Sequence, residues 1–383
     1  MNAQPQPHDN RSVPVTGADR VPVMRPQLPT ADELLPYLRR MDATRWYSNF
    51  GPLLTELTQT LAAHYGVRAD QTSIVANGTV ALSAALVALG AKPGTKCLLP
   101  SWTFVGSAAA VWAANLVPHF VDVDPETWML DPKALLRRSD LREVGAVMPV
   151  SAFGSPVDTS VWDAFWQETG IPVLIDGAAS FDTVASDASS RPGRSPIMIS
   201  LHATKVFGIG EGGLLLSTDA DLVRRFHKVC NFGVLGPPAG QILGYNGKLS
   251  EYNAAVGLAM FERWPERRVR VHELTQRYRA ALRSVPAATT LPGYGEGWIS
   301  CYCNVKLDRE SEPVIEALAR HGVETRRWWQ SGVHLQPAYK DFPRDPLPVT
   351  EELAARVFGL PFFHDLSEEQ LERVIDALGA SLS

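Results

Sequence analysis

Short apolar runs alternate with helical patterns from Thr72 to about residue 217. This alternation is typical of a mainly parallel sheet whose strands are joined by crossover helices. The clearest helix is Val80–Leu89, whose alanines and leucines suit burial. The runs expected to form strands are Ser73–Ala76, Lys96–Leu99, His119–Val123, Val147–Val150, Val173–Asp176, Met198–Leu201 and Gly213–Ser217. The pattern therefore predicts an α/β fold with a mainly parallel sheet sandwiched by helices.

The pattern changes around Ser250. A long helical pattern begins at Glu251, is interrupted near Pro265 and resumes to about Val285, which indicates a hinge. The remainder predicts a smaller α+β domain with a strand at Ile299–Lys306, a helix at Pro313–His321 and a last helix that begins at a capping box, Ser367-x-x-Gln370. We expect a flexible N-terminal tail at 1–20, rich in Pro, Gln, Asn and Asp, a large domain at 21–250 and a small domain at 251–383.

Composition narrows the class of partner. Lysine plus arginine number 36 and aspartate plus glutamate number 41, giving a net charge of −5 without a long basic run. Nucleic acid and anionic membrane are therefore not expected partners. No stretch approaches the roughly 20 apolar residues that cross a bilayer, and no signal-peptide core begins the chain, so we expect a cytoplasmic protein. The four cysteines form no C-x-x-C pair, and no metal site is expected.

Polar residues that follow the apolar runs are the candidates for chemistry, because open parallel sheets bind ligands at the carboxyl ends of their strands. After the first run, Asn77, Gly78 and Thr79 lead into a helix, and amide groups at a helix N-terminus suit a phosphate. A turn capped by Thr79 explains the same residues. After the second run, Trp102 and Phe104 offer a ring on which a flat cofactor could stack, although both could fill the core.

Two charged residues complete this set. Asp176 ends an apolar run, where a buried carboxylate needs a cation or hydrogen bonds to offset its burial; capping the next helix is the alternative. Lys205 lies between an apolar strand and the glycine-rich stretch Gly208–Gly213. Burial there would favour the neutral amine that forms a Schiff base with a carbonyl, whereas an ordinary surface lysine would stay solvated.

Together these four features fit a single ligand that carries a phosphate, a flat ring, a basic ring nitrogen and an aldehyde. Pyridoxal 5′-phosphate has all four groups. The conjunction over about 130 residues is more specific than any single feature.

At this point the chain resembles the nucleotide-sugar aminotransferases of the DegT/DnrJ/StrS family, within the fold type I pyridoxal-phosphate enzymes related to aspartate aminotransferase. The resemblance runs from about Asn49 to the C-terminus. Its strongest segments are Asn77–Leu82, Pro100–Phe104, Phe120–Asp124, Lys205–Gly213 and Gly244–Ser250.

The resemblance implies a role for each matching residue. Lys205 would bind the cofactor aldehyde and Asp176 would pair with its ring nitrogen. Phe104 would stack on the ring, and the phosphate would be held by Gly78, Thr79, Ser200 and, from the neighbouring subunit, Asn246. The active unit would thus be a homodimer with shared sites.

Two departures from the family pattern stand out. Ala179 occupies a position where the family commonly has glutamine or histidine beside the cofactor, so that support for the ring hydroxyl is missing. The Arg326-Arg327-Trp328-Trp329 run is bulkier and more basic than usual, and precedes the family-like stretch His334–Tyr339. Arg326 and Arg327, with His334, are candidate substrate residues, because guanidinium groups match diphosphate oxygens; a solvated basic face is the alternative.

The reaction implied is a transamination that moves an amino group from glutamate to a keto sugar of a nucleoside diphosphate, with pyridoxamine phosphate as the intermediate form of the cofactor. Amino sugars made in this way serve surface polysaccharides, lipopolysaccharides or secondary metabolites. A sugar dehydratase on the same scaffold would have histidine at the position of Lys205. A cyclitol aminotransferase and a non-catalytic sensor remain alternatives.

Overall fold

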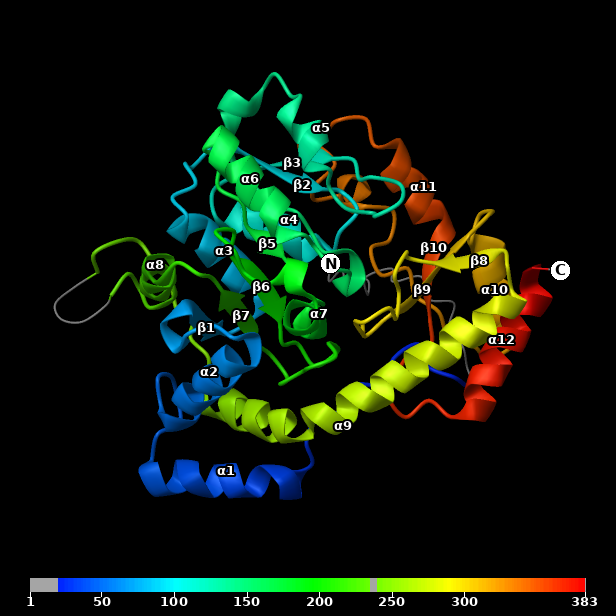
Figure 1. Cartoon of the computed structure of the whole chain (residues 1–383), viewed down its shortest axis with the longest axis horizontal. Coiled ribbons are helices and arrows are strands. Elements are labelled where there is room, and N and C mark those ends of the chain that lie inside the picture. The colour runs from blue at the N-terminus through cyan, green and yellow to red at the C-terminus, as the bar shows by residue number, and fades with distance from the viewer. Residues whose placement is uncertain (1–19, 235–239, 383) are drawn as a thin grey trace, which may run out of the picture.

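The computed structural model of the chain describes residues 20–234 and 240–382 (Figure 1). Residues 1–19 of the expected tail lie outside this part of the chain. The helices are α1 (Ala31–Thr44), α2 (Pro52–Tyr65), α3 (Gly78–Ala88), α4 (Val105–Ala113), α5 (Pro132–Leu136), α6 (Thr159–Thr169), α7 (Phe181–Ser186), α8 (Ala220–Cys230), α9 (Glu251–Ala281), α10 (Glu312–Arg320), α11 (Pro348–Arg356) and α12 (Glu368–Leu382). The strands are β1 (Thr72–Val75), β2 (Lys96–Pro100), β3 (Val117–Val121), β4 (Val144–Val147), β5 (Ile175–Asp176), β6 (Ile197–Ser200), β7 (Gly213–Leu216), β8 (Ala288–Thr290), β9 (Cys303–Leu307) and β10 (Val357–Leu360).

Two groups of strands make the central sheet, in the orders β1-β7-β6-β5 and β3-β2-β4. Parallel bridges from Val147 to Val173 and from Val150 to Asp176 join the two groups. Strand β7 is antiparallel to its neighbours β1 and β6, whereas β2 pairs in parallel with β3 and β4, and β5 with β6. The predicted mainly parallel sheet is confirmed, and each of the runs predicted in this region overlaps a strand.

Side chains that alternate along the strands give this sheet two apolar faces. Leu98 and Ile197 belong to the cluster on one face, to which α2, α6, α7 and α9 contribute. Leu99 and Met198, each one residue further on, belong to the cluster on the other face, with α3, α4 and α8. The result is a sheet between two layers of helices.

The expected interruption near Pro265 is wrong, because α9 runs unbroken from Glu251 to Ala281. A proline inside a helix removes one backbone donor and strains the preceding turn. Here Trp264 on one side of the proline and Val271 on the other are both buried. Packing on both sides therefore keeps the helix continuous, and Figure 1 shows α9 as one helix that bends along its length and connects the two parts of the molecule.

The C-terminal part is built on a second sheet, in the order β10-β9-β8. The predicted capping box is present before α12, where Ser367 and Gln370 exchange hydrogen bonds of 3.1 Å in both directions. Val21 forms a parallel bridge with Val323, so the start of the described chain lies against this part rather than against the central sheet. The expected domain boundary at residue 250 stays a prediction. The first residues of the expected large domain pack against the C-terminal part.

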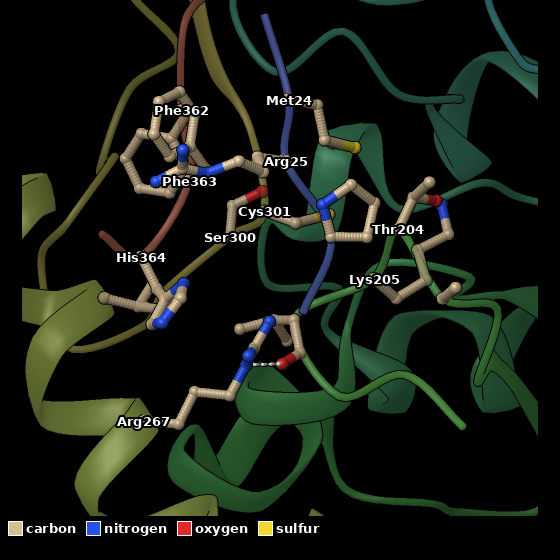
Figure 2. A pocket seen from close by; sticks show the side chains of 14 residues that line it. Met24, Arg25, Thr204, Lys205, Arg267, Ser300, Cys301, Phe362, Phe363 and His364 are labelled. Atoms are coloured by element: carbon tan, nitrogen blue, oxygen red, sulfur yellow. Dashed lines mark hydrogen bonds between the residues drawn. The ribbon is translucent and has the colours of Figure 1, made fainter. Parts of the chain in front are cut away.

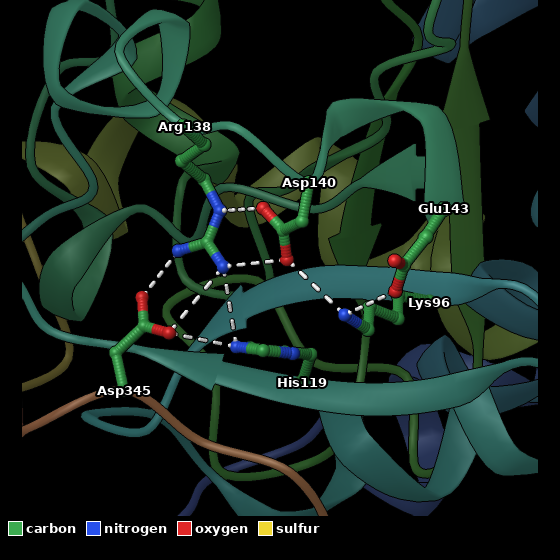
Figure 3. A network of polar contacts seen from close by, with 6 residues as sticks. All are labelled: Lys96, His119, Arg138, Asp140, Glu143 and Asp345. Carbon is green, nitrogen blue, oxygen red and sulfur yellow. Dashed lines mark hydrogen bonds and ion pairs between the residues drawn. The ribbon is translucent and has the colours of Figure 1, made fainter.

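A polar network fixes a C-terminal loop to the edge of the central sheet (Figure 3). The Asp345 amide donates a hydrogen bond of 2.9 Å to the carbonyl of Phe120, and its Oδ1 lies 2.8 Å from Nε2 of His119 on β3. Arg138 pairs with both Asp345 and Asp140. The network members are Lys96, His119, Arg138, Asp140, Glu143 and Asp345. The loop that carries His334 is thereby anchored from the far side.

Candidate active site

The N-terminus of α3 lies against the end of β6. The Asn77 side chain accepts a hydrogen bond from the Val80 amide, 2.9 Å away, while the amides of Gly78 and Thr79 open the helix and have no intrahelical acceptor. A Cβ atom on Gly78 would lie 3.2 Å from Sδ of Met198 and 3.4 Å from Cβ of Ser200. Gly78 therefore allows the helix to approach β6 closely, and brings two amides and the Ser200 hydroxyl to one place.

Phe104 lies beside this helix N-terminus. A Cβ atom on Gly106 would be 3.1 Å from the Phe104 ring and 3.4 Å from Oγ1 of Thr79, which places the two side chains around one point. Phe104 is 61% exposed, whereas Trp102 is 2% exposed and contacts the core. Of the two aromatic residues left open by the sequence, Phe104 is thus the ring that is free to stack on a ligand.

Asp176 ends β5 and is 4% exposed. Its Oδ2 accepts a hydrogen bond of 2.7 Å from the Ser107 hydroxyl, and its Oδ1 accepts one of 3.1 Å from the Ala178 amide. Burial raises the pKa of Asp176 above its usual value, although Ser107, Ala178 and Lys205 act to lower it. The carboxylate is therefore short of positive charge in this structure, and a cationic ring nitrogen fits that deficit.

Lys205 is half-buried in a loop whose backbone is closely held. Its amide donates to the carbonyl of His202 at 2.9 Å, and the carbonyl of the next residue, Val206, accepts a 2.8 Å hydrogen bond from Nε of Arg267 on α9. The loop closes through backbone hydrogen bonds from Ala203 to Gly210, Leu201 to Gly212 and Ile209 to Leu201. Gly208 is required because a Cβ there would lie 2.8 Å from Cα of Ala203.

The Lys205 amine does not match the neutral form expected from burial alone. Burial lowers its pKa, but Tyr302, Cys301 and Asp176 all raise it, and the pKa lies above the ordinary lysine value. The Nζ atom donates a 2.9 Å hydrogen bond to Oη of Tyr302. In this state Lys205 is an ammonium, because its interactions with Tyr302, Cys301 and Asp176 together outweigh the cost of burial.

Two residues of this site were not identified from the sequence. Ser107 lies in the first turn of α4 and donates to Asp176; Tyr302 lies just before β9 and accepts from Lys205. Each belongs to a segment that packing brings in from 69 or 97 positions away in the chain. Neither carries a motif, so no local signal could have found it.

Asn246 is the candidate residue that the resemblance assigns to a neighbouring subunit. Asn246 is exposed and bridges to Asn231, and the carbonyl of the next residue, Gly247, accepts a hydrogen bond from Ala76 at the end of β1. The segment that carries Asn246 therefore lies beside the residues that lead from β1 into α3. The expectation that it serves a neighbouring subunit stays a prediction.

The candidate substrate residues of the C-terminal part are partly occupied by protein contacts. Arg327 pairs with Glu312 at 2.9 Å and donates to Ser311. His334 is 1% exposed, with Nδ1 2.7 Å from Oγ of Ser101. Arg326 is half-buried, with its guanidinium stacked 5.0 Å from the centroid of the Trp328 ring. Arg326 is therefore the freest of the three to meet a substrate.

A small cavity lies beside the Lys205 loop (Figure 2). Its volume is about 30 Å³, and among its lining residues are Lys205, Arg267, Cys301 and His364. A cavity of this size holds one or two water molecules. It cannot admit a nucleoside diphosphate, so the exposed Thr79 and Phe104 mark the open side of the site instead.

Over the described ranges, no helix is both long and apolar enough to cross a bilayer. In the same residues, no group of three or more His, Cys, Asp or Glu side chains is placed to hold a metal ion. The four cysteines are buried free thiols.

Solved structures with this fold are pyridoxal-phosphate aminotransferases of fold type I, the class that the sheet and the lysine–aspartate site define. A Bacillus cereus structure described as a putative PLP-dependent aminotransferase matches with a TM-score of 0.86 at 28% identity, covering 94% of this chain and 100% of that one. DesI, solved in the presence of its TDP-sugar product, matches with a TM-score of 0.84 at 29% identity, covering 96% and 94%.

The chain belongs to the DegT/DnrJ/EryC1/StrS aminotransferase family, whose model matches residues 30–379. Protein Rv3402c of Mycobacterium tuberculosis is 32% identical over 373 residues, covering 94% of this chain and 89% of that one. A dTDP-4-amino-4,6-dideoxy-D-glucose transaminase of Shigella dysenteriae is 28% identical, covering 93% and 97%. The resemblance that the motifs indicated is thus confirmed at the level of the family.

Proposed function

We propose that this protein is a pyridoxal-phosphate-dependent aminotransferase that transfers an amino group from glutamate to a keto sugar of a nucleoside diphosphate. The observation that carries the proposal is the half-buried Lys205 beside the buried Asp176 at the carboxyl edge of the sheet, next to a helix N-terminus. The family supports sugar transamination in general. DesI and the Shigella relative make a thymidine diphosphate sugar the first acceptor to test.

The residues present fit the cofactor. Gly78, Thr79 and Ser200 offer two amides and a hydroxyl to its phosphate, and Phe104 offers an exposed ring for stacking. Asp176, whose pKa is raised by burial, would gain a cationic partner in the ring nitrogen. Bound pyridoxal phosphate supplies the ring that accepts electrons from the substrate carbon.

The protein's own residues then divide the work. Asp176 keeps a proton on the ring nitrogen, held in orientation by the Ser107 hydroxyl and the Ala178 amide. Lys205 would bind the cofactor's aldehyde. When free of it, the Lys205 amine would carry the proton that leaves the donor's α-carbon.

A homodimer with shared sites is part of the proposal. Phe232 is 56% exposed and Leu243 is 95% exposed. Leu243 lies three residues before Asn246, and the Phe232 amide donates a hydrogen bond to the carbonyl of Tyr245, next to Asn246. Trp46 and Tyr252 add further exposed aromatic surface. Apolar groups exposed in this way favour a protein interface, which supports Asn246 as the residue given to the phosphate of the neighbouring site.

The test is the absorption spectrum of the purified protein with cofactor, glutamate and then each of a panel of nucleoside-diphosphate keto sugars. We expect the cofactor–lysine band to bleach with glutamate and to return with one sugar. Lys205→Ala should lose the band and turnover, while Lys340→Ala, at an exposed lysine outside the site, should keep both. Return of the band with a keto cyclitol alone would favour the cyclitol alternative, and bleaching by no amino donor would favour a sensor.

A further inference from the structure

The amine of Lys205 is held by a residue from the other part of the molecule. Its Nζ atom lies 2.9 Å from Oη of Tyr302 and 5.3 Å from the centroid of the Tyr302 ring. Tyr302 precedes β9 in the C-terminal part, whereas Lys205 follows β6 in the central sheet. This hydrogen bond therefore links the two parts at the reactive atom.

Tyr302 has little freedom to move. It is 9% exposed, and its ring meets those of Trp328 and Phe153 edge to face, with centroids 4.8 Å and 5.6 Å away. Its backbone amide donates to Oγ of Ser300 at 3.2 Å, and that hydroxyl donates to the carbonyl of Phe153 at 2.6 Å. The phenol oxygen is thus a fixed point on which a flexible lysine side chain can settle.

The phenol is neutral at neutral pH, since burial raises the pKa of Tyr302 to about 12. Burial also raises the pKa of the Cys301 thiol, which therefore stays protonated. Of the titratable groups that face Lys205, which are Tyr302, Cys301 and Asp176, only the carboxylate bears charge at neutral pH. A neutral phenol can accept a hydrogen bond from an ammonium and donate one to a neutral amine, so it can hold Nζ in either protonation state.

We propose that Tyr302 is a positioning residue for Lys205, holding the amine whenever it is not bound to the cofactor and keeping it within reach of the proton it must move. This proposal rests on the transamination proposed above. In such a reaction the lysine is free during the proton transfer. A long side chain without an anchor would then sample many conformations, and few of them would place the amine near the proton. The 2.9 Å contact provides that anchor without adding charge to the site.

The first test uses the protein without cofactor. The chain has eight lysines, so lysine labelled with ¹³C at Cε gives a countable set of NMR signals, and Lys205→Arg identifies the signal of Lys205. Tyr302→Phe should move the Lys205 signal to its neutral-amine position at lower pH than in the wild type. Tyr294→Phe, at a buried phenol that faces Cys303 and Tyr278 rather than Lys205, should leave it unchanged.

The second test uses the loaded enzyme. Tyr302→Phe should slow the glutamate half-reaction by about 10- to 100-fold, with cofactor content and the KM for glutamate little changed, and Tyr302→His should recover part of the loss. An unshifted Lys205 signal in Tyr302→Phe, or a half-reaction at the wild-type rate, would overturn the proposal. The NMR result needs no turnover, so absence of a cofactor band in the wild type would refute the proposed function separately. Should Tyr302→Phe not fold, Tyr302→Leu, which also lacks the phenol hydroxyl, carries the same two measurements.

Discussion

Removing the Ser107 hydroxyl should destabilise the protein in a way that depends on pH. This hydroxyl donates a 2.7 Å hydrogen bond to Oδ2 of Asp176, and both side chains are buried. A hydrogen bond to a charged group contributes about 1.5–3 kcal/mol. At 1.36 kcal/mol per pKa unit, its loss in Ser107→Ala corresponds to an upward shift of about 1–2 units in the pKa of Asp176.

The sign follows from proton linkage. Burial already raises the pKa of Asp176 above its unfolded value, so between the two values the folded protein binds more protons than the unfolded chain. The contribution of this group to the free energy of unfolding therefore falls as pH rises through that interval. Ser107→Ala extends the interval upward, so its cost should be full near neutral pH and smaller toward acid pH, where Asp176 is protonated.

The assay is urea unfolding of the cofactor-free protein at a series of pH values. Ser83→Ala is the matched control, because Ser83 is equally buried but contacts neutral groups, the Tyr245 hydroxyl at 2.6 Å and the Val80 carbonyl. We expect about 0.5–1.5 kcal/mol for the control, independent of pH. A cost for Ser107→Ala that is equally independent of pH would refute the view that this hydroxyl stabilises a charged Asp176.

Three further outcomes are expected. Phe104→Ala should weaken cofactor binding by about tenfold in an absorbance titration, with less than about 0.5 kcal/mol change in stability, because the ring is 61% exposed; unchanged cofactor affinity would contradict its stacking role. Arg267→Met should cost about 1–3 kcal/mol in urea unfolding, since it leaves the Val206 carbonyl beside Lys205 without its 2.8 Å hydrogen bond; an unchanged midpoint would contradict this. Coexpressed Lys205→Ala and Asn246→Ala subunits should regain about a quarter of wild-type activity, since half the dimers would carry one intact site; no recovery beyond the separate variants would contradict shared sites.

The functional residues at the strand ends could be predicted, because each lies next to an apolar run that is visible in the sequence. Asp176 and Lys205 each stand beside an apolar run, and the sheet places both at the same edge. Sequence alone could not decide between Trp102 and Phe104, because exposure depends on what packs over a ring; the fold buries the first and leaves the second open.

Long-range packing accounts for what the sequence did not predict. Tyr302 reaches Lys205 because β9 and the aromatic rings around it set its position, and no spacing along the chain encodes that contact. The same cause explains Pro265, whose local preference to break a helix is overridden by buried neighbours on both sides. The protonation of Lys205 depended likewise on partners that only the assembled site provides.

The closed backbone of the Lys205 loop bears on how the protein acquires its cofactor. Since hydrogen bonds within the loop and from Arg267 already fix its course, capture of the cofactor need not consume free energy in ordering it. A newly synthesised chain can therefore bind the cofactor as soon as it has folded. An enzyme that releases the pyridoxamine form of its cofactor can likewise bind fresh cofactor without refolding. The rigid loop that positions the Lys205 amine thus also allows the cofactor to be exchanged repeatedly.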